Sequence, residues 1–234
     1  MTAADTSPEP PWWTPRKAVV RRSLSREVIV AAALKVLRAE GIDAVSMRRI
    51  ATELGTGAAS LYAHVAHKEE LLELVFDEVV SEVPLPDPDP RHWQEQVTQL
   101  WSDSCAALAR NGEIARVAIG RIPVGPHALR LSEATMSLLR MGGVPDQAVA
   151  WAVDVIGLYV SANAVERSLA ADRERAGADD DAYYADVGSY FAALPADRFP
   201  VTLALGAALM QGSAEERFRF GLDLLVRGLA ALVE

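Results

Sequence analysis

The chain has 234 residues, half of them hydrophobic, a formal net charge of −9 and one cysteine, Cys105. This length allows one or two domains with a sizeable core. A single cysteine excludes an intramolecular disulfide and fits the reducing cytoplasm, where we expect the protein to reside. No uninterrupted run reaches the roughly 18 apolar residues of a membrane helix, and residues 1–15 lack the apolar stretch of a signal peptide, so no membrane partner is expected.

The charge is distributed unevenly along the chain. Residues 16–68 hold ten Lys and Arg against four Asp and Glu, a net charge of +6. Residues 69–234 hold 13 against 26, a net charge of −13. A basic region of this kind suits phosphate binding, and the acidic remainder would repel a polyanion and favour one docking orientation. The acidic total therefore does not exclude a nucleic-acid partner.

The N-terminal part is expected to contain a flexible arm and a first helix. Residues 1–22 form the arm, which is polar and Pro-rich at its start and basic at its end. A helix is predicted to begin near Ser25 and to end at Gly41. Its inward-facing residues recur at helical spacing: Ile29, Ala32, Ala33, Val36 and Leu37.

Residues 46–72 have the pattern of two short helices joined by a glycine turn and followed by a third helix. Ser46 stands at an N-cap position, and Gly55 stands where a helix must end with positive φ. The first short helix is predicted to bury Met47, Ile50, Ala51 and Leu54. The second repeats this spacing at Ala58, Leu61, Tyr62 and Val65, which leaves Ala59, Ser60, Ala63 and His64 outward. A short helix with small, uncharged outward residues on a packed partner fits the major groove of DNA, so residues 23–68 are predicted to bind DNA.

The rest of the chain is predicted to be helical. A fourth helix should span residues 68–83 and bury Leu72, Val75, Phe76, Val79 and Val83. The segment PLPDPDP at 84–90 breaks helices and marks a boundary. Further helices are predicted at 91–111, 113–120, 126–141, 145–174, 182–194, 200–211 and 214–233. Helix starts are marked by Pro126, Pro145, Pro200 and a capping box of Ser213 with Glu216.

The predicted fold is therefore all-α. A three-helix helix-turn-helix DNA-binding domain at 23–68 precedes a helical ligand-binding and dimerisation domain at 69–234. The helix from Pro145 and the last helix each carry an apolar seam. We predict a homodimer interface on these seams: Val149, Val153, Ile156, Val160, Phe218, Leu222, Leu225 and Leu229. Ordinary core packing is the alternative for either helix, but a homodimer is expected in any case, because one short recognition helix reads few base pairs.

Three elements of the helix-turn-helix segment resemble the signature of the TetR family of bacterial one-component regulators. They are Ala51 to Gly55, Ser60 to Val65, and Lys68 with Leu71 and Leu72. Their spacing matches throughout. The resemblance implies a homodimer on a palindromic DNA operator, most simply a repressor that a small-molecule effector releases. An activator or a regulator without an effector is the rival within this class.

The resemblance also implies the DNA contacts. Tyr62 and His64 match positions that usually reach the phosphate backbone, and Lys68 adds its charge nearby. Arg48 matches a position that reads a base or a phosphate, with a solvated surface arginine as the alternative. The remaining predicted contacts are Ser46, Thr56, Gly57, Ala58, Ala59 and Ser60. Because these residues are small, with methyl groups at Thr56, Ala58 and Ala59, direct readout by hydrogen bonds should be sparse and contact with thymine methyl groups favoured.

The sparse readout gives the N-terminal arm a predicted role. Its cations are Arg16, Lys17, Arg21 and Arg22. A flexible arm bearing arginines is able to enter the adjacent minor groove and read its width. The alternative is a basic tail that supplies only non-specific attraction.

Residues 92–166 resemble the C-terminal domain of the tetracycline-repressor subgroup, through Trp93-Gln94, Val117 to Pro123, and Gly157 to Glu166. The subgroup's histidine for a magnesium–tetracycline chelate is matched by Ala118, and its threonine by Arg121. These departures predict no metal and no cofactor, with an apolar or aromatic effector instead. The predicted pocket residues are Trp101, Ser104, Ala118, Arg121, Thr135, Met136, Leu139, Val153 and Gly157. Plain core is the alternative for each apolar one.

The sequence contains no pattern that indicates an enzyme. Nucleophile elbow, phosphate loop and catalytic dyad are absent, and the four histidines lack paired metal-ligand spacing. The acidic run 179–181 lacks the spacing of a calcium loop. We therefore expect a regulator and not an enzyme. The alternative is a helical small-molecule-binding protein or enzyme with a vestigial DNA-binding domain.

Overall fold

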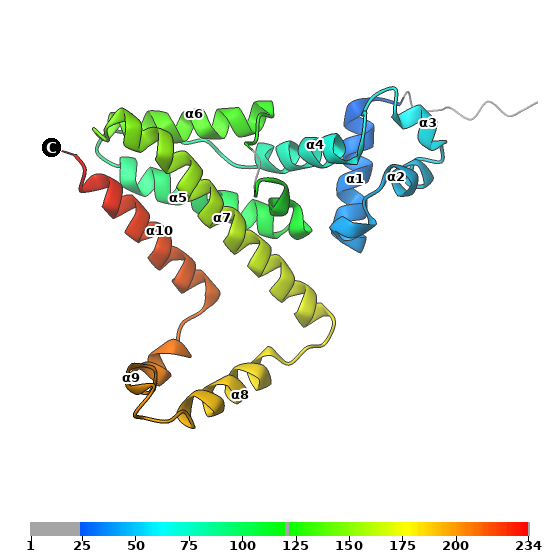
Figure 1. The fold of residues 1–234 in the computed structure, drawn as a ribbon. Coiled ribbons are helices and arrows are strands. Elements are labelled where there is room, and N and C mark those ends of the chain that lie inside the picture. The colour runs from blue at the N-terminus through cyan, green and yellow to red at the C-terminus, as the bar shows by residue number, and fades with distance from the viewer. Residues whose placement is uncertain (1–23, 120–121, 234) are drawn as a thin grey trace, which may run out of the picture.

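The computed structural model describes residues 24–119 and 122–233, and this part of the chain is helical without any strand (Figure 1). The predicted arm and Arg121 lie outside the described residues. The helices are α1 Arg26–Glu40, η1 Ile42–Ala44, α2 Met47–Glu53, α3 Ala58–Leu61, α4 Lys68–Ser81, α5 Trp93–Ala109, η2 Gly112–Val117, α6 Pro126–Met141, α7 Asp146–Arg175, α8 Asp180–Ala192, α9 Pro200–Leu209 and α10 Ala214–Ala230. The all-α prediction is confirmed.

The predicted helices are present, with three corrections. The helix expected at 113–120 is the short 3₁₀-helix η2, with non-helical torsions at Glu113 inside it. Such tight turns occur in short connecting pieces, where an α-helix has no room to propagate. The fourth helix ends at Ser81, before the proline-rich segment. Pro145 is the N-cap of α7, one position before the helix, whereas Pro126 and Pro200 are first residues as predicted.

Helices α1 to α4 pack around one apolar centre at the end of the molecule that holds the N-terminal domain (Figure 1). Ser25 caps α1 by accepting a hydrogen bond from the Val28 amide at 3.4 Å. The five inward residues predicted for α1 are all buried. Gly41 ends the helix with a φ of 84°, a left-handed value that glycine adopts without a Cβ clash.

Helix α4 joins this domain to the rest of the molecule. It packs on α1 at one end and on α5, η2 and α6 further along (Figure 1). Leu71, Val75 and Val79 are fully buried along it, whereas Leu72, which was predicted to face inward, is half-buried. Leu71, Val75 and Val79 are four residues apart, so they share one face of the helix and Leu72 lies at its edge. The boundary predicted at residue 68 stays a prediction, since α4 belongs to both packing groups.

The C-terminal body is built from α5, η2, α6 and α7, with α10 packed on α5 and α7. Tyr159 fixes α10 to α7. Its hydroxyl donates a hydrogen bond to the Phe218 carbonyl at 3.0 Å, and its ring is nearly parallel to the Phe218 ring, with the ring centroids 5.7 Å apart. A Cβ at position 221 would overlap the Tyr159 hydroxyl, so Gly221 is required for this approach. The predicted capping box of Ser213 and Glu216 starts α10 and is confirmed.

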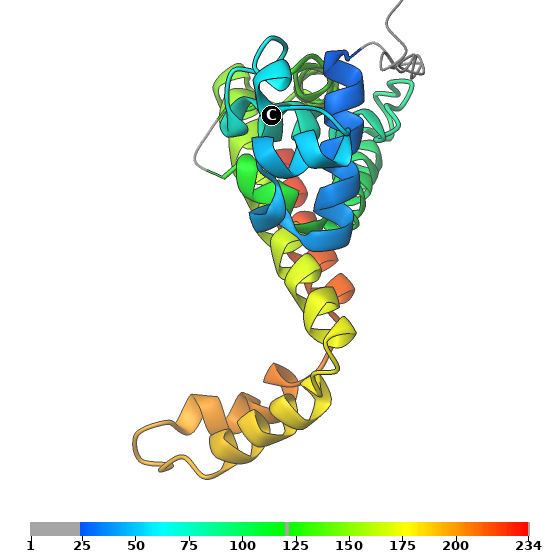
Figure 2. The same cartoon turned by 90° about the vertical axis from the view of Figure 1, so that its right-hand side faces the viewer.

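Helices α8 and α9 form an arm that projects away from this body (Figure 2). They contact each other, and α9 has no buried residue although almost every residue in it is apolar. Helix α7, which leads into the arm, is by length and composition alone apolar enough to cross a membrane, with a mean hydropathy of 1.6 over 18 residues. One face of α7 lies in the protein core, as expected for a central helix of a globular body.

Candidate functional site

The turn between α2 and α3 has the geometry that the sequence predicted. The Ser46 hydroxyl accepts the Arg49 amide at 3.2 Å and so starts α2. Gly55 has a φ of 63°, and the Thr56 amide donates to the Ala51 carbonyl at 2.9 Å, which closes the end of the helix. Met47, Ile50 and Ala51 are buried beneath it. Helix α2 therefore forms a fixed support for the segment that follows.

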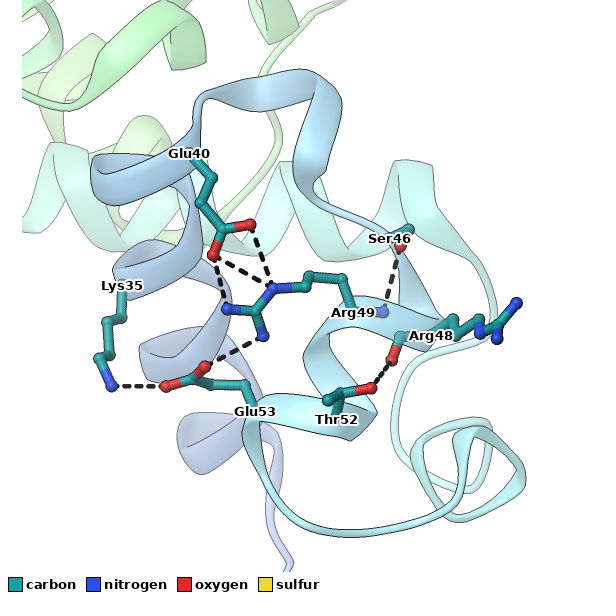
Figure 3. Close-up of polar contacts among 7 residues, drawn as sticks. All are labelled: Lys35, Glu40, Ser46, Arg48, Arg49, Thr52 and Glu53. Carbon is teal, nitrogen blue, oxygen red and sulfur yellow. Dashed lines mark hydrogen bonds and ion pairs between the residues drawn. The ribbon is translucent and has the colours of Figure 1, made fainter.

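Arg49 is held within the protein by two glutamates (Figure 3). Its guanidinium reaches Glu40 at 2.5 Å and Glu53 at 3.0 Å, and Lys35 meets Glu53 at 2.5 Å. The hydrogen bonds from Glu40 and then Glu53 raise the pKa of Arg49, and Arg49 lowers the pKa of Glu40. The pKa of Glu53 is lowered by Lys35 first and Arg49 second. These contacts join α1 to α2 and use the Arg49 donors.

The neighbouring Arg48 has the opposite orientation. Its side chain is exposed and points away from the network around Arg49 (Figure 3). Within the described part of the chain it has no ion-pair partner. Thr52 contributes only to the helix here, because its hydroxyl donates to the Arg48 carbonyl at 3.0 Å. Of two adjacent arginines, one holds the domain together and the other is available to a ligand.

Helix α3 presents a short outward face. It has four residues, of which Leu61 is fully buried, and Val65 beyond it is also buried. Tyr62 is 54% exposed, so the prediction that it packs inward is wrong. The helix ends at Leu61, and Tyr62 follows as its C-cap with the ring in solvent. This exposure leaves the phenol free for the phosphate contact that was predicted separately.

The other predicted DNA contacts surround Tyr62 in the chain. Gly57, Ala59 and Ser60 are exposed, and Thr56, Ala58, His64 and Lys68 are half-buried. Gly57 is the N-cap of α3. The His64 carbonyl accepts a hydrogen bond from the Arg26 guanidinium at 3.3 Å, which connects the end of this segment to α1. The structure thus gathers small uncharged groups and one phenol on the α3 segment, and their contact with bases stays a prediction.

Few cations of the N-terminal domain are without an acidic partner. Besides Lys35 and Arg49, Arg38 pairs with Glu82 at 3.1 Å and Arg26 with Glu70 at 3.5 Å. Of the lysines and arginines among the described residues 24–68, only Arg48 and Lys68 take part in no ion pair. The arm cations Arg16, Lys17, Arg21 and Arg22 lie outside the described residues. Much of the net charge of +6 therefore depends on residues 16–22.

His67 is a structural residue that the sequence reading missed. Its Nδ1 atom accepts a hydrogen bond from the Glu70 amide at 3.1 Å, and the Glu70 carboxylate accepts one from the Ala66 amide at 2.6 Å. Because the lone pair of Nδ1 accepts this hydrogen bond, Nδ1 has no hydrogen to donate to the Glu69 carboxylate, and their 3.3 Å approach is not an ion pair. The sequence signal for this position is Glu70, three residues after the N-cap, as in a capping box. Histidine is uncommon as an N-cap, and the pattern was therefore easily overlooked.

Replacing His67 with alanine is expected to destabilise the protein by about 1 kcal/mol, because the Glu70 amide at the start of α4 loses its acceptor. His67→Asn keeps an acceptor at this position and should retain most of the stability. Urea denaturation at neutral pH measures both variants. Equal stability of His67→Ala and the wild type would contradict the capping role.

The predicted effector residues lie in and around the core of the C-terminal body. Trp101, Ser104, Thr135 and Leu139 are buried, Ala118, Met136, Val153 and Gly157 are half-buried, and Arg121 is outside the described residues. The Ser104 and Thr135 hydroxyls donate to carbonyls of their own helices at 2.7 and 2.9 Å. The Trp101 Nε1 atom is buried and has no acceptor within the described part of the chain.

Two hollows in the described part of the chain lie away from these residues. One of about 640 Å³ is bordered by the end of α7 and the starts of α8 and α10. Another of about 470 Å³ lies between α4 and the start of α6. The predicted pocket residues line neither, so their role in ligand binding stays a prediction. A buried indole N–H without an acceptor is nevertheless the kind of group that a bound molecule satisfies.

The predicted dimer seams are partly wrong. Val149, Ile156, Val160, Phe218 and Leu222 are at most 3% exposed within one chain, which makes them core and leaves nothing for a partner to cover. Val153, Leu225 and Leu229 are half-buried. The periodicity was real, but α7 is apolar on two faces, and spacing alone does not tell which face meets the same chain.

A second apolar seam faces outward instead. It consists of exposed apolar residues on the two packed helices α7 and α10: Trp151, Val155, Leu158, Phe220 and Leu224. Trp151 and Phe220 are both 66% exposed. On α7 these residues recur at intervals of four and then three. Each lies two positions after a residue of the predicted seam, so the outward face also has coiled-coil spacing. An exposed apolar stripe of this size marks an interaction surface.

Two family models match the chain. One, described as "Bacterial regulatory proteins, tetR family", covers residues 29–75, and one described as "Tetracyclin repressor-like, C-terminal domain" covers residues 85–233. Among curated relatives, the HTH-type transcriptional repressor DrrR1 of Streptomyces coeruleorubidus is 33% identical over 90% of this chain and 79% of its own length. The tetracycline repressor of class C from Escherichia coli is 24% identical over 88% of this chain and 90% of its own.

Solved structures agree with these matches. The TetR family protein ActR of Streptomyces coelicolor, in complex with actinorhodin, is 41% identical, with a TM-score of 0.82 over 90% of this chain and 97% of its own. Apo ActR gives a TM-score of 0.81 at 39% identity, over 89% of this chain and 96% of its own. These relatives are transcriptional regulators, and the matching models extend over most of the sequence. This chain belongs to the TetR family of bacterial transcriptional regulators.

Proposed function

We propose that this protein is a homodimeric repressor that binds a palindromic DNA operator and is released from it by a small apolar or aromatic effector. The observation that carries the proposal is the α2–α3 unit. Arg48 and Tyr62 are exposed on it, while Arg49 is held inside the domain by Glu40 and Glu53. A rigid support with an exposed short helix is what insertion into the major groove requires. We expect the protein to act in the cytoplasm.

Operator binding is tested by selecting duplexes from random DNA with the purified protein and by gel shift with the DNA that flanks its own gene. A repressor of this kind should enrich a palindrome and give a salt-sensitive, sequence-specific complex. Absence of any enriched sequence and of any specific complex would overturn the proposal. The enriched palindrome, here named the selected duplex, serves as the probe in the tests that follow.

The outward seam supports the homodimer. A helix that is apolar on two faces is stable in water only when both are covered. One face of α7 lies in its own core, and the other face carries Trp151, Val155 and Leu158, which are exposed in the single chain. A second copy that presents the same seam covers it in the self-complementary manner of a two-fold dimer. We propose that α7 and α10 of each subunit form this interface.

The α8–α9 arm supports the same dimer. Its exposed apolar residues are Tyr183, Tyr184, Tyr190, Phe199, Val201, Leu205 and Leu209. Helices α8 and α9 connect the end of α7 to the start of α10, the two helices of the proposed interface (Figure 2). An apolar hairpin whose two helices pack chiefly on each other is expected to pack on the partner subunit, and we propose this as its position in the dimer.

Two contacts are expected to divide the DNA affinity between positioning and readout. Tyr62→Ala removes a phosphate donor from each subunit and should weaken binding to all duplexes by about tenfold or more. Arg48→Ala should instead relax the sequence preference at one base pair of each half-site, with a loss of about 1–3 kcal/mol in binding free energy. Fluorescence anisotropy with the selected duplex and its single-base variants measures both. Equal and uniform losses in the two variants would refute this division.

For the effector, ActR supplies a probe because it was solved in complex with actinorhodin. We propose that a related compound lies beside Trp101, whose Nε1 atom is buried without an acceptor. Gly157 faces the benzo edge of this ring, where a Cβ would lie in ordinary contact at 3.8 Å from Cη2. A carbonyl or phenolic oxygen on a flat molecule would satisfy the indole donor.

Trp101→Phe keeps an aromatic ring and removes only the N–H donor. It is expected to weaken actinorhodin binding by about tenfold, the value of one buried hydrogen bond. Trp93→Phe, at the start of α5, removes a similarly buried indole and serves as the control, which should bind like the wild type. Isothermal titration with actinorhodin compares the three proteins. Unchanged binding by Trp101→Phe would place the ligand elsewhere.

A further inference from the structure

A buried carboxylate lies where α4 meets α6. Asp77 projects from the middle of α4 and is only 7% exposed, although carboxylates are rarely buried without a specific partner. Its Oδ1 atom accepts two hydrogen bonds, from the His127 amide at 3.0 Å and from the Ala128 amide at 2.9 Å. Both donors belong to the first turn of α6, 50 residues further along the chain. One side chain therefore connects the two helices.

Asp77 takes the place of an N-cap residue for α6. The residue in the N-cap position is Gly125, which has no side chain to accept a hydrogen bond, and Pro126 that follows has no N–H. The next two amides are the donors that an N-cap side chain ordinarily satisfies. Here the acceptor comes from another helix, so the start of α6 is capped only while α4 is in place.

The backbone of α6 sits directly on this carboxylate. A Cβ added at Gly125 would overlap the Asp77 side chain, so no other residue permits the same approach. On its other side the joint borders the hollow of about 470 Å³, whose wall includes Leu74 and Phe76 of α4 and residues 122–126. Ile122 is 85% exposed there. Apolar packing of α6 on α4 and these two hydrogen bonds together fix the first turn of α6, and only the hydrogen bonds depend on a single side chain.

We propose that Asp77 is the positioning residue that couples α6 of the C-terminal body to the DNA-binding surface. Helix α4 begins at Lys68, beside the α3 segment, and Asp77 lies nine residues along it, about 14 Å at 1.5 Å per residue. A displacement of α6 is thus transmitted to α4 through the cap. The inference rests on the proposed operator binding. Because coupling between two sites is reciprocal, DNA bound at α3 must also change the first turn of α6.

The reciprocal effect gives a test that requires no effector. Hydrogen exchange of the His127 and Ala128 amides is measured by NMR in the full-length dimer, with and without the selected duplex. In the wild type we expect DNA to change their exchange rates by at least about threefold. Asp77→Ala should abolish this DNA-dependent change, and Asp77→Asn, which retains the Oδ1 acceptor, should restore at least part of it.

Val79→Ala is the matched control, because it removes fully buried atoms from the same helix and leaves the cap intact. It should lower stability yet keep the DNA-dependent change. The proposal is overturned if the wild-type amides do not respond to bound DNA, if Asp77→Ala responds like the wild type, or if Val79→Ala loses the response as well. Failure of the proposed function has a different signature, since the wild type would then bind no duplex at all.

Discussion

Removal of residues 1–22 is expected to weaken operator binding by more than tenfold at physiological salt and to flatten its salt dependence. In the described part of the N-terminal domain, only two lysine or arginine side chains, Arg48 and Lys68, are outside ion pairs. The N-terminal arm, residues 1–22, holds four cations in each subunit and therefore eight in a dimer. Each phosphate that a cation neutralises contributes about 0.9 to the slope of log affinity against log salt. The slope should therefore decrease by up to about 7.

Anisotropy with the selected duplex between about 50 and 200 mM salt measures this slope. A full-length variant with Arg16, Lys17, Arg21 and Arg22 replaced by alanine separates charge from chain length and should behave like the deletion. Lys35→Met is the control, because Lys35 is already paired with Glu53 and its loss should alter the slope by less than about 1. Unchanged affinity and slope in the deletion would remove the arm from DNA recognition.

Trp151→Glu is expected to convert the protein into monomers and to reduce operator affinity by more than 100-fold. The substitution places a charge on the outward seam of α7 in place of a large aromatic side chain, the kind of residue that contributes most to an interface once it is desolvated. Each monomer then holds one recognition helix and reads only a half-site. Phe220→Glu on α10 should act in the same way, because Phe220 has the same exposure.

Sedimentation equilibrium measures the mass directly, with 25.2 kDa for one chain and twice that for the dimer. Val149→Ala is the control from the buried seam. It should lower stability, because it leaves a cavity in the core, and still sediment as a dimer. If Trp151→Glu remains a dimer, the interface lies elsewhere on the molecule.

Local patterns predicted much of the fold. The helix start near Ser25, the caps at Ser46 and Ser213 and the turn at Gly55 depend on residues within four positions of each other, and the structure confirms them. The helix-turn-helix was recognisable for the same reason. A short segment with a fixed turn leaves little freedom in the spacing of its buried residues.

The features that failed or were missed depend on distant partners. The buried and the outward seams of α7 have the same spacing, and only the packed chain shows that Ile156 is core and Trp151 is not. Asp77 looks like an ordinary helix-surface carboxylate until α6 is placed against it. Arg48 and Arg49 are adjacent in sequence, and only the positions of Glu40 and Glu53 separate their roles.

The most direct test of the regulator assignment is the affinity of the wild-type dimer for the selected duplex compared with a scrambled duplex of equal composition, at fixed salt. A TetR-type operator complex should be at least about 10³-fold tighter than the scrambled complex. Tyr62→Ala should weaken both complexes, and added salt should weaken both. Equal affinity for the two duplexes would contradict the assignment, because phosphate contacts alone would then account for all binding.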